Sequence, residues 1–152
     1  MKRINSSMQL TRGADYGVRV MTQLAGVPSG ERVSLPALAR ATEAPESFLS
    51  KVLQSLTRAS LITSRRGQSG GFRITQRGRR ASMREVIEAI DGEICLNVCL
   101  VHGRTCPRKA WCEAHPVWVK AQQAMLQVLS GSSIAALAGV KPANDGSFGL
   151  WR

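Results

Sequence analysis

All four cysteines and both histidines of this 152-residue chain lie in one short segment, CLNVCLVHGRTCPRKAWCEAHPVW, which runs from Cys95 to Trp118. Thiolate and imidazole are the side-chain ligands that iron–sulfur clusters and zinc take. The N-terminus lacks the apolar core of a signal peptide, so we expect a cytoplasmic protein whose thiols stay reduced. Cysteines clustered in that compartment bind metal or carry out redox chemistry more often than they form structural disulfides. The segment is therefore predicted to be a metal or thiol site.

The elements on either side of this segment are predicted to be helices. SMREVIEAIDG opens with a capping box formed by Ser82 and Glu85, and Gly92 ends the helix. Gly103 and Pro107 indicate that the cysteine segment is a loop, which lets ligands converge from several directions. HPVWVKAQQAMLQVLSG then predicts a long helix whose apolar side chains suit a dimer interface better than packing within one chain.

Basic charge is concentrated in the first half of the chain. The net charge is +11, and residues 1–84 carry 15 of the 21 Lys and Arg but 4 of the 10 Asp and Glu. A field of this sign attracts a polyanion, of which DNA is the usual case, although a basic surface can also serve solubility alone. No apolar run approaches the ~20 residues of a membrane-spanning helix, so we expect no membrane partner.

Two helices joined by a turn are predicted in VSLPALARATEAPESFLSKVLQSLTRASLI. Ser34 can cap the first helix, and Pro45 begins the second. The second helix has one apolar side and one polar, partly basic side, a division typical of the recognition helix of a helix-turn-helix. Its apolar stripe consists of Phe48, Leu49, Val52, Leu53 and Leu56. A preceding helix, ending at Gly26, has its apolar face at Leu10, Ala14, Val18, Met21 and Ala25.

A β-hairpin follows the two helices in LITSRRGQSGGFRIT. The apolar and β-branched residues at both ends favour strands, and the glycine-rich stretch between them predicts a turn. A hairpin in this position is typical of a wing, whose arginines Arg65 and Arg66 can reach phosphates or a minor groove. An ordinary surface hairpin is the alternative.

Together these patterns resemble the Rrf-type winged-helix regulators of transcription. The resemblance rests on MQLTRGADYGVRVM, on the helix pair, on ASLITSRRGQSGGFRIT and on SMREVIEAIDG, and it runs from Met8 to about Gly139. It implies a mainly α fold with a small β-hairpin, a winged helix-turn-helix followed by a long C-terminal dimerisation helix. It also implies a homodimer that binds a DNA operator, usually as a repressor.

The resemblance assigns a role to each part of the chain. Residues 1–7 would be a flexible leader, 8–91 the DNA-binding domain, 92–115 a cysteine-rich cluster-binding loop, 116–139 the dimerisation helix region and 140–152 a flexible tail. The residues that fall where the family contacts DNA are Ser47, Ser50, Lys51, Arg65 and Arg66. Ser50 departs from the glutamate of the family's cluster biogenesis regulator, so that regulator's target sites are not expected here.

Many members of the family carry an iron–sulfur cluster that senses iron, redox state or nitric oxide. The resemblance places its ligands at Cys99, Cys106 and Cys112, and leaves Asp15 and His115 as alternative fourth ligands, with Cys95 a third choice. A histidine ligand resembles the [2Fe-2S] members, and three cysteines with a carboxylate resemble a [4Fe-4S] member. Zinc is the alternative metal, although the segment lacks the usual pair of CxxC motifs.

We therefore expect a DNA-binding transcriptional regulator that senses its signal through an iron–sulfur cluster. A cluster-free regulator that responds to a ligand or to thiol oxidation is the alternative. An enzyme is not expected, because the sequence has no CxxC pair, no nucleotide-binding glycine motif and no nucleophile–base arrangement. No small-molecule substrate is expected either.

Overall fold

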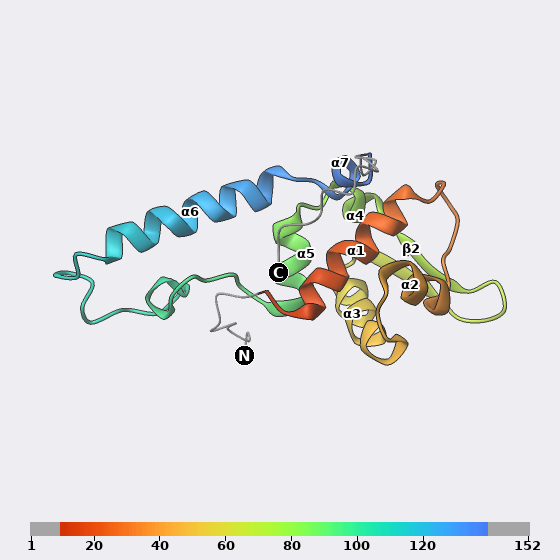
Figure 1. The fold of residues 1–152 in the computed structure, drawn as a ribbon, viewed down its shortest axis with the longest axis horizontal. Helices are drawn as coiled ribbons and strands as arrows, with labels where there is room; N and C mark the ends of the chain where they lie inside the picture. Colours follow the sequence, from red (N-terminus) through yellow and green to blue (C-terminus); the bar gives the residue numbers. More distant parts are fainter. Residues whose placement is uncertain (1–9, 140–152) are drawn as a thin grey trace.

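The computed structural model describes residues 10–139, so the leader predicted at 1–7 and the tail predicted at 140–152 lie outside the described residues. Within this range the fold is mainly helical with one antiparallel hairpin (Figure 1). No helix of the described range is long and apolar enough to cross a membrane. The elements are α1 (Arg12–Gly26), α2 (Leu35–Thr42), α3 (Glu46–Arg58), β1 (Ile62–Arg65), β2 (Gly71–Ile74), α4 (Gln76–Arg80), α5 (Met83–Asp91), η1 (Val98–Leu100), α6 (His115–Gly131) and α7 (Ile134–Gly139).

Helix α1 passes through the core, and other helices pack around it. Its predicted apolar face is confirmed for Ala14, Met21 and Ala25, which are buried, and Val18 packs against the same core. The prediction for Leu10 is wrong. Because the Thr11 hydroxyl accepts a hydrogen bond from the backbone N–H of Ala14, the helix begins at Arg12, and Leu10 remains 49% exposed before it.

The helix-turn-helix forms as the sequence predicts. The Ser34 hydroxyl caps α2 by accepting from the Ala37 N–H at 3.3 Å, and α3 follows directly after Pro45. The predicted stripe of α3 is buried except for Phe48, which is 40% exposed and packs edge-on against the Tyr16 ring.

The wing is a two-stranded ribbon attached to the start of α2. Strand β1 pairs with β2 in the register that places Ile62 opposite Ile74. At the base of β2, Phe72 and Val33 exchange two backbone hydrogen bonds of 2.9 and 2.8 Å. Gly71 permits this approach, because its φ is +135° and an added Cβ would lie 2.6 Å from the Val33 carbonyl oxygen.

Helix α4 is absent from the sequence-based expectations. Its five residues are too few to show a helical period, and Thr75, which reads as the end of a strand, is its N-cap. The Arg79 guanidinium donates hydrogen bonds to the carbonyl oxygens of Ala25 and Val27 at 2.8 and 3.2 Å. The short helix therefore satisfies carbonyls at the end of α1.

Beyond α5 the chain leaves the winged-helix part and then returns to it. The cysteine segment and α6 extend as an arm, and α7 lies back on the domain (Figure 1). The Ile134 side chain is fully buried, and its N–H donates to the Ala81 carbonyl at 2.9 Å. The helix predicted from His115 onward is confirmed as α6, yet none of its residues is fully buried.

The capping box of α5 gives a prediction about acid stability. The Ser82 backbone N–H and hydroxyl both donate to the Glu85 carboxylate, at 2.9 and 3.1 Å. These hydrogen bonds, the backbone one foremost, hold the pKa of Glu85 below its usual 4.5 against the opposing effect of desolvation. A depressed pKa stabilises the fold above the unfolded-state value, and this contribution is lost as the pH falls through the folded-state value.

We therefore expect Glu85→Gln to destabilise the protein at pH 7, with the difference from wild type shrinking as the pH falls below 4.5. Urea unfolding followed by circular dichroism between pH 3 and 7 measures this difference. Ser82→Ala is the comparison, because it removes the helix cap at a cost of about 1 kcal/mol and leaves in place the backbone hydrogen bond to Glu85, which is the first cause of the lowered pKa. A Glu85→Gln effect that does not change with pH would contradict the assignment.

Candidate DNA interface and cysteine segment

The recognition helix and the wing enclose a groove of about 510 Å³. Three residues singled out from the sequence meet there, because Ser50 comes from α3 and Arg65 and Arg66 come from the hairpin. The other two, Ser47 and Lys51, are exposed on α3 outside this groove. The lining residues are Ser50, Leu53, Gln54, Thr57, Arg58, Ser64, Arg65, Arg66 and Phe72.

Four polar residues of this groove, Gln54, Thr57, Arg58 and Ser64, were not among the predicted contacts. Gln54 and Arg58 are exposed and lie one and two helical turns after Ser50, so all three share one face of α3. The sequence placed both on the polar side of the helix without assigning a role. Their spacing at intervals of four residues from Ser50 indicates that they share its face of the helix. The sequence could not show that the wing lies opposite that face.

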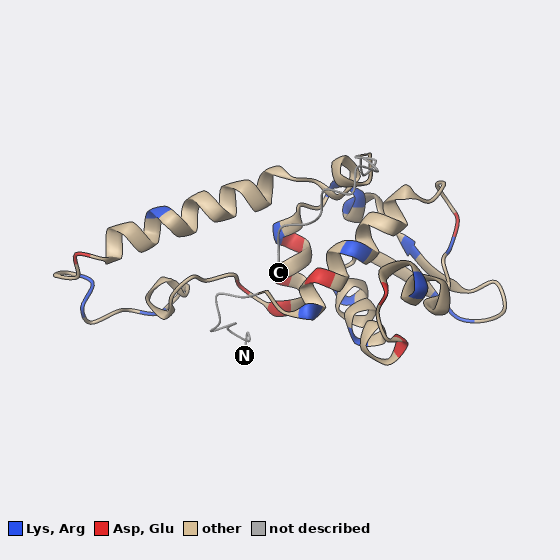
Figure 2. Ribbon diagram, viewed as in Figure 1, with Lys and Arg blue, Asp and Glu red and all other residues tan. Residues whose placement is uncertain are grey.

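The charge on this side of the molecule suits a polyanion. The winged-helix part carries most of the Lys and Arg, whereas α6 carries only Lys120 (Figure 2). Among residues 10–139 the ion pairs are Arg19–Asp15 and Arg84–Glu88. Arg65 and Arg66 thus have no acidic partner in the described part of the chain, and their guanidinium groups are free for phosphate oxygens.

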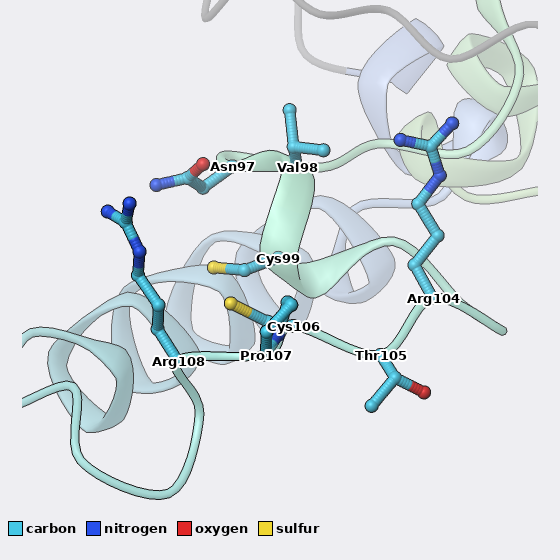
Figure 3. A pocket seen from close by; sticks show the side chains of 8 residues that line it. All are labelled: Asn97, Val98, Cys99, Arg104, Thr105, Cys106, Pro107 and Arg108. Atoms are coloured by element: carbon cyan, nitrogen blue, oxygen red, sulfur yellow. The ribbon is translucent and has the colours of Figure 1, made fainter.

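Cys99 and Cys106 belong to one pocket of about 370 Å³ in the cysteine segment. Their sulfur atoms lie on the same side of it, with Arg108 and Arg104 on its flanks (Figure 3). Cys99 lies on η1, whereas Cys106 follows the turn around Gly103. The sequence prediction that this segment is largely irregular is thus consistent with the structure, and two of the three predicted thiols are close together.

The remaining candidates lie outside this pocket. The Cys112 carbonyl accepts from the His115 N–H at 3.1 Å, so one turn leads from Cys112 into α6. Ala114 is the N-cap of that helix, and no side chain of the described residues forms a capping hydrogen bond there. Asp15, in the first turn of α1, pairs with Arg19 at 3.0 Å on the surface.

Within residues 10–139 no three His, Cys, Asp or Glu side chains converge in the way that a metal ion needs. The predicted ligand set of Cys99, Cys106, Cys112 and either Asp15 or His115 therefore stays a prediction. In kind, the donors fit an iron–sulfur cluster, because all four cysteines are free thiols and three lie on an irregular, partly exposed stretch.

Cys95 has a different environment from the other three cysteines. It is 9% exposed, and burial foremost, followed by the charges of Glu93 and Glu88, raises the pKa of its thiol. A thiol that stays protonated reacts slowly and is a poor metal ligand. Burial of this kind suits a small apolar residue, so Cys95 stays the third choice among the predicted fourth ligands.

Comparison with known proteins connects this architecture to regulators of transcription. The model of a family described as Rrf2, iron-dependent transcriptional regulator, matches residues 10–139. The chain is 32% identical over 145 residues to the protein aau3 of Rhizobium meliloti, covering 94% of this chain and 93% of that protein. It is 28% identical over 131 residues to the HTH-type transcriptional regulator NsrR of Geobacillus kaustophilus, covering 86% of this chain and 89% of NsrR.

Solved structures confirm the fold class. CymR, the global cysteine regulator of B. subtilis, superposes with a TM-score of 0.73 at 21% identity, over 89% of this chain and 99% of CymR. The T. potens IscR structure gives a TM-score of 0.68 at 22% identity over 86% of each chain. At this level of identity the likeness shows a shared, mainly helical winged-helix fold.

Proposed function

The chain belongs to the Rrf2 family of iron-dependent transcriptional regulators, and from this membership we propose that it is a homodimeric DNA-binding repressor that senses iron, redox state or nitric oxide through an iron–sulfur cluster. The observation that carries the DNA-binding part is the groove between α3 and the wing, where Arg65 and Arg66 form no ion pair with any acidic side chain of residues 10–139. The observation that carries the sensing part is the pocket shared by Cys99 and Cys106.

DNA binding follows from the chemistry of that groove. In this proposal α3 enters a major groove and presents Ser47, Ser50, Lys51 and Gln54 to base edges and phosphates. Arg65 and Arg66 on the wing contact backbone phosphates or a neighbouring minor groove. The basic charge of the first half of the chain supplies a salt-dependent attraction that does not depend on sequence.

We expect Arg65→Ala and Arg66→Ala to weaken binding to a DNA duplex enriched from a random pool by the wild-type protein. Each lost phosphate contact should reduce the slope of log affinity against log salt by about one. Fluorescence anisotropy between 50 and 300 mM salt measures both quantities. Lys120→Ala is the matched control, because it removes an equal charge from α6, and an equal loss in that variant would refute a wing contact.

Dimer formation is supported by a stripe of exposed apolar residues along α6. Val117, Ala121, Ala124 and Val128 recur at helical spacing on one face, and Val117 and Val128 are 66% and 70% exposed. The two central residues are small, which lets a second helix approach closely. A second copy of this chain is the occupant that fits, because the same stripe would then be buried on both sides.

Placing a charge on this stripe should separate the protomers. We expect Val117→Asp/Val128→Asp to be a monomer by light scattering at micromolar concentration, whereas wild type has the mass of a dimer. Gln123→Asp is the matched control, since it adds a charge on another face of α6, and it should remain dimeric. If the double variant is still a dimer and its helix content is unchanged, α6 does not form the dimer interface.

A bound iron–sulfur cluster would supply a group that responds to iron, oxidants or nitric oxide. The residues that would hold it are Cys99, Cys106 and Cys112, with Asp15 or His115 as the fourth ligand. Cys99 and Cys106 already share a pocket and Cys112 is not among its lining residues, so closing the site requires Cys112 to approach them. The movement of Cys112 toward Cys99 and Cys106 would rearrange the cysteine segment. This rearrangement alters operator affinity if one arrangement of the dimer binds DNA better.

Metal analysis of protein purified without oxygen tests the sensing proposal. We expect matched iron and sulfide with broad visible absorption, which Cys99→Ser, Cys106→Ser and Cys112→Ser each abolish. Cys95→Ser is the control and should retain iron, because that thiol is buried outside the pocket of Cys99 and Cys106 and burial raises its pKa. Comparing Asp15→Ala with His115→Ala then identifies the fourth ligand. Zinc in place of iron, or no metal after anaerobic reconstitution, would overturn the cluster.

A cluster-free regulator that responds to thiol oxidation is the second candidate function. The observation that favours it is the same pair, since Cys99 and Cys106 have sulfur atoms on one side of one pocket (Figure 3). An oxidant such as diamide would then join the two sulfurs, because it accepts the two electrons and the two protons of the thiols and is itself reduced to the hydrazine. Metal-free protein whose DNA affinity changes with diamide, and not in Cys106→Ser, would favour this candidate.

A further inference from the structure

One side chain of α6 is hydrogen bonded to the start of the cysteine segment. The Gln122 carboxamide oxygen accepts from the Leu96 N–H at 2.9 Å, and its nitrogen donates to the Ile94 carbonyl at 2.5 Å. The amide thus pairs with the backbone on both sides of Cys95, much as a neighbouring strand would. Glutamine suits this position because it offers one donor and one acceptor at the end of a side chain long enough to reach.

These two hydrogen bonds are the polar connection between the two elements. Within the described range no other side chain of α6 forms a hydrogen bond with residues 93–105. Apolar contact is made by Met125, Leu126 and Leu129, which pack against the buried cluster that Ile94 forms with Ala14 and Ile87. Apolar contacts of this kind tolerate sliding, whereas a pair of opposed hydrogen bonds specifies one register.

The position of this connection along the chain matters for sensing. On one side, the Asp91 carboxylate accepts from the N–H of Thr11 at 3.1 Å and also from its hydroxyl, which fixes the end of α5 to the start of α1. On the other side lie Cys99 and the pocket that it shares with Cys106. The residues that Gln122 contacts therefore lie between a fixed point of the domain and the thiols.

The same two hydrogen bonds also connect the middle of α6 to the cysteine segment. Gln122 lies on the half-buried face of the helix, and the exposed stripe of Val117, Ala121, Ala124 and Val128 lies on another face. The C-terminal end of α6 is held by α7, whose Ile134 is buried in the core. A shift of Ile94–Leu96 would therefore move the middle of α6 relative to an end that stays in place.

We propose that Gln122 is the positioning residue that couples the cysteine segment to α6, so that a rearrangement around Cys99 and Cys106 is transmitted to the stripe where two protomers meet. This inference rests on the proposed function, because it names the route by which the sensing site acts on the dimer. A purely local anchor is the competing role, and it would stabilise the segment without affecting the response of DNA binding.

The test compares Gln122→Met with Gln123→Met in the full-length protein. Methionine nearly keeps the shape of glutamine and lacks both hydrogen-bonding groups, and Gln123 is exposed on the adjacent position of the same helix. The first readout is the rate at which maleimide labels Cys95 in reduced, metal-free protein, resolved for each cysteine by mass spectrometry. We expect about tenfold faster labelling in Gln122→Met, because the backbone on both sides of that thiol is released, and no change in Gln123→Met.

The second readout is the ratio of DNA affinities between cluster-loaded and metal-free protein, on the duplex enriched by wild type. We expect Gln122→Met to retain iron content and dimer mass while this ratio falls about fivefold or more toward one, since coupling between sites is typically of that size. Gln123→Met should keep the wild-type ratio. An unchanged ratio in Gln122→Met overturns the coupling, even where labelling is faster, because Gln122 is then a local anchor.

Failure of the proposed function has a separate signature. If wild type binds no iron, the cluster proposal fails. The ratio of DNA affinities is then measured between dithiothreitol-reduced and diamide-oxidised protein, and the coupling through Gln122 again requires this ratio to fall toward one in Gln122→Met. If neither ratio departs from one in wild type, unchanged labelling of Cys95 in Gln122→Met refutes the connection itself. If Gln122→Met does not fold by circular dichroism, Gln122→Glu replaces it, because glutamate retains the acceptor for Leu96 and loses the donor for Ile94.

Discussion

The close approach of α1 to α5 is the constraint on which the rest of the molecule depends. A Cβ added at Gly17 would overlap the Ile90 side chain and lie 3.7 Å from a methyl group of Val52. Helices α5 and α3 therefore both pack against the same face of α1 where it carries no side chain. The recognition helix α3 and helix α5, which leads into the cysteine segment, both pack on α1. A displacement of one of them therefore changes the packing of the other.

The same packing sets where the cysteine segment begins. Because α5 lies so near α1, its last residue, Asp91, reaches the N–H and hydroxyl of Thr11. Thr11 also caps α1, and Asp15, in the first turn of that helix, is one of the two candidate fourth ligands. The N-terminus of α1, which the sequence presents as an ordinary helix start, is therefore structurally linked to the proposed sensing segment. The Asp15–Arg19 ion pair is exposed and weak, so it costs little to give up if the carboxylate takes another partner.

Local patterns in the sequence predict most of the elements and few of the contacts between them. The capping box at Ser82 and the apolar period of α3 are specified within a few residues, and both are confirmed. Helix α4 was not predicted, because its five residues are too few to show a helical period. Leu10 was wrongly assigned to the apolar face of α1, because Thr11 caps that helix and leaves Leu10 before its first residue. Gln122 lies 26 and 28 residues from its two partners, and no local pattern reports a hydrogen bond of that range. Prediction of the candidate site has the same limit. The sequence shows that the cysteines lie in one segment, but their spacing does not show that Cys99 and Cys106 share a pocket or that Cys95 is buried.

The arm also shows why a sensing segment of this kind needs outside support. Residues 92–114 contain one three-residue helix, η1, so they have little regular structure of their own to hold a shape. Their position is set by the Asp91–Thr11 hydrogen bonds at one end, the turn from Cys112 into α6 at the other, and Gln122 between them. A segment fixed at a few points has low local stability, and a ligand that binds several of its side chains can reorder it at modest cost in free energy. Because one of those points lies on α6, whose exposed stripe suits a second protomer, that reordering need not remain local.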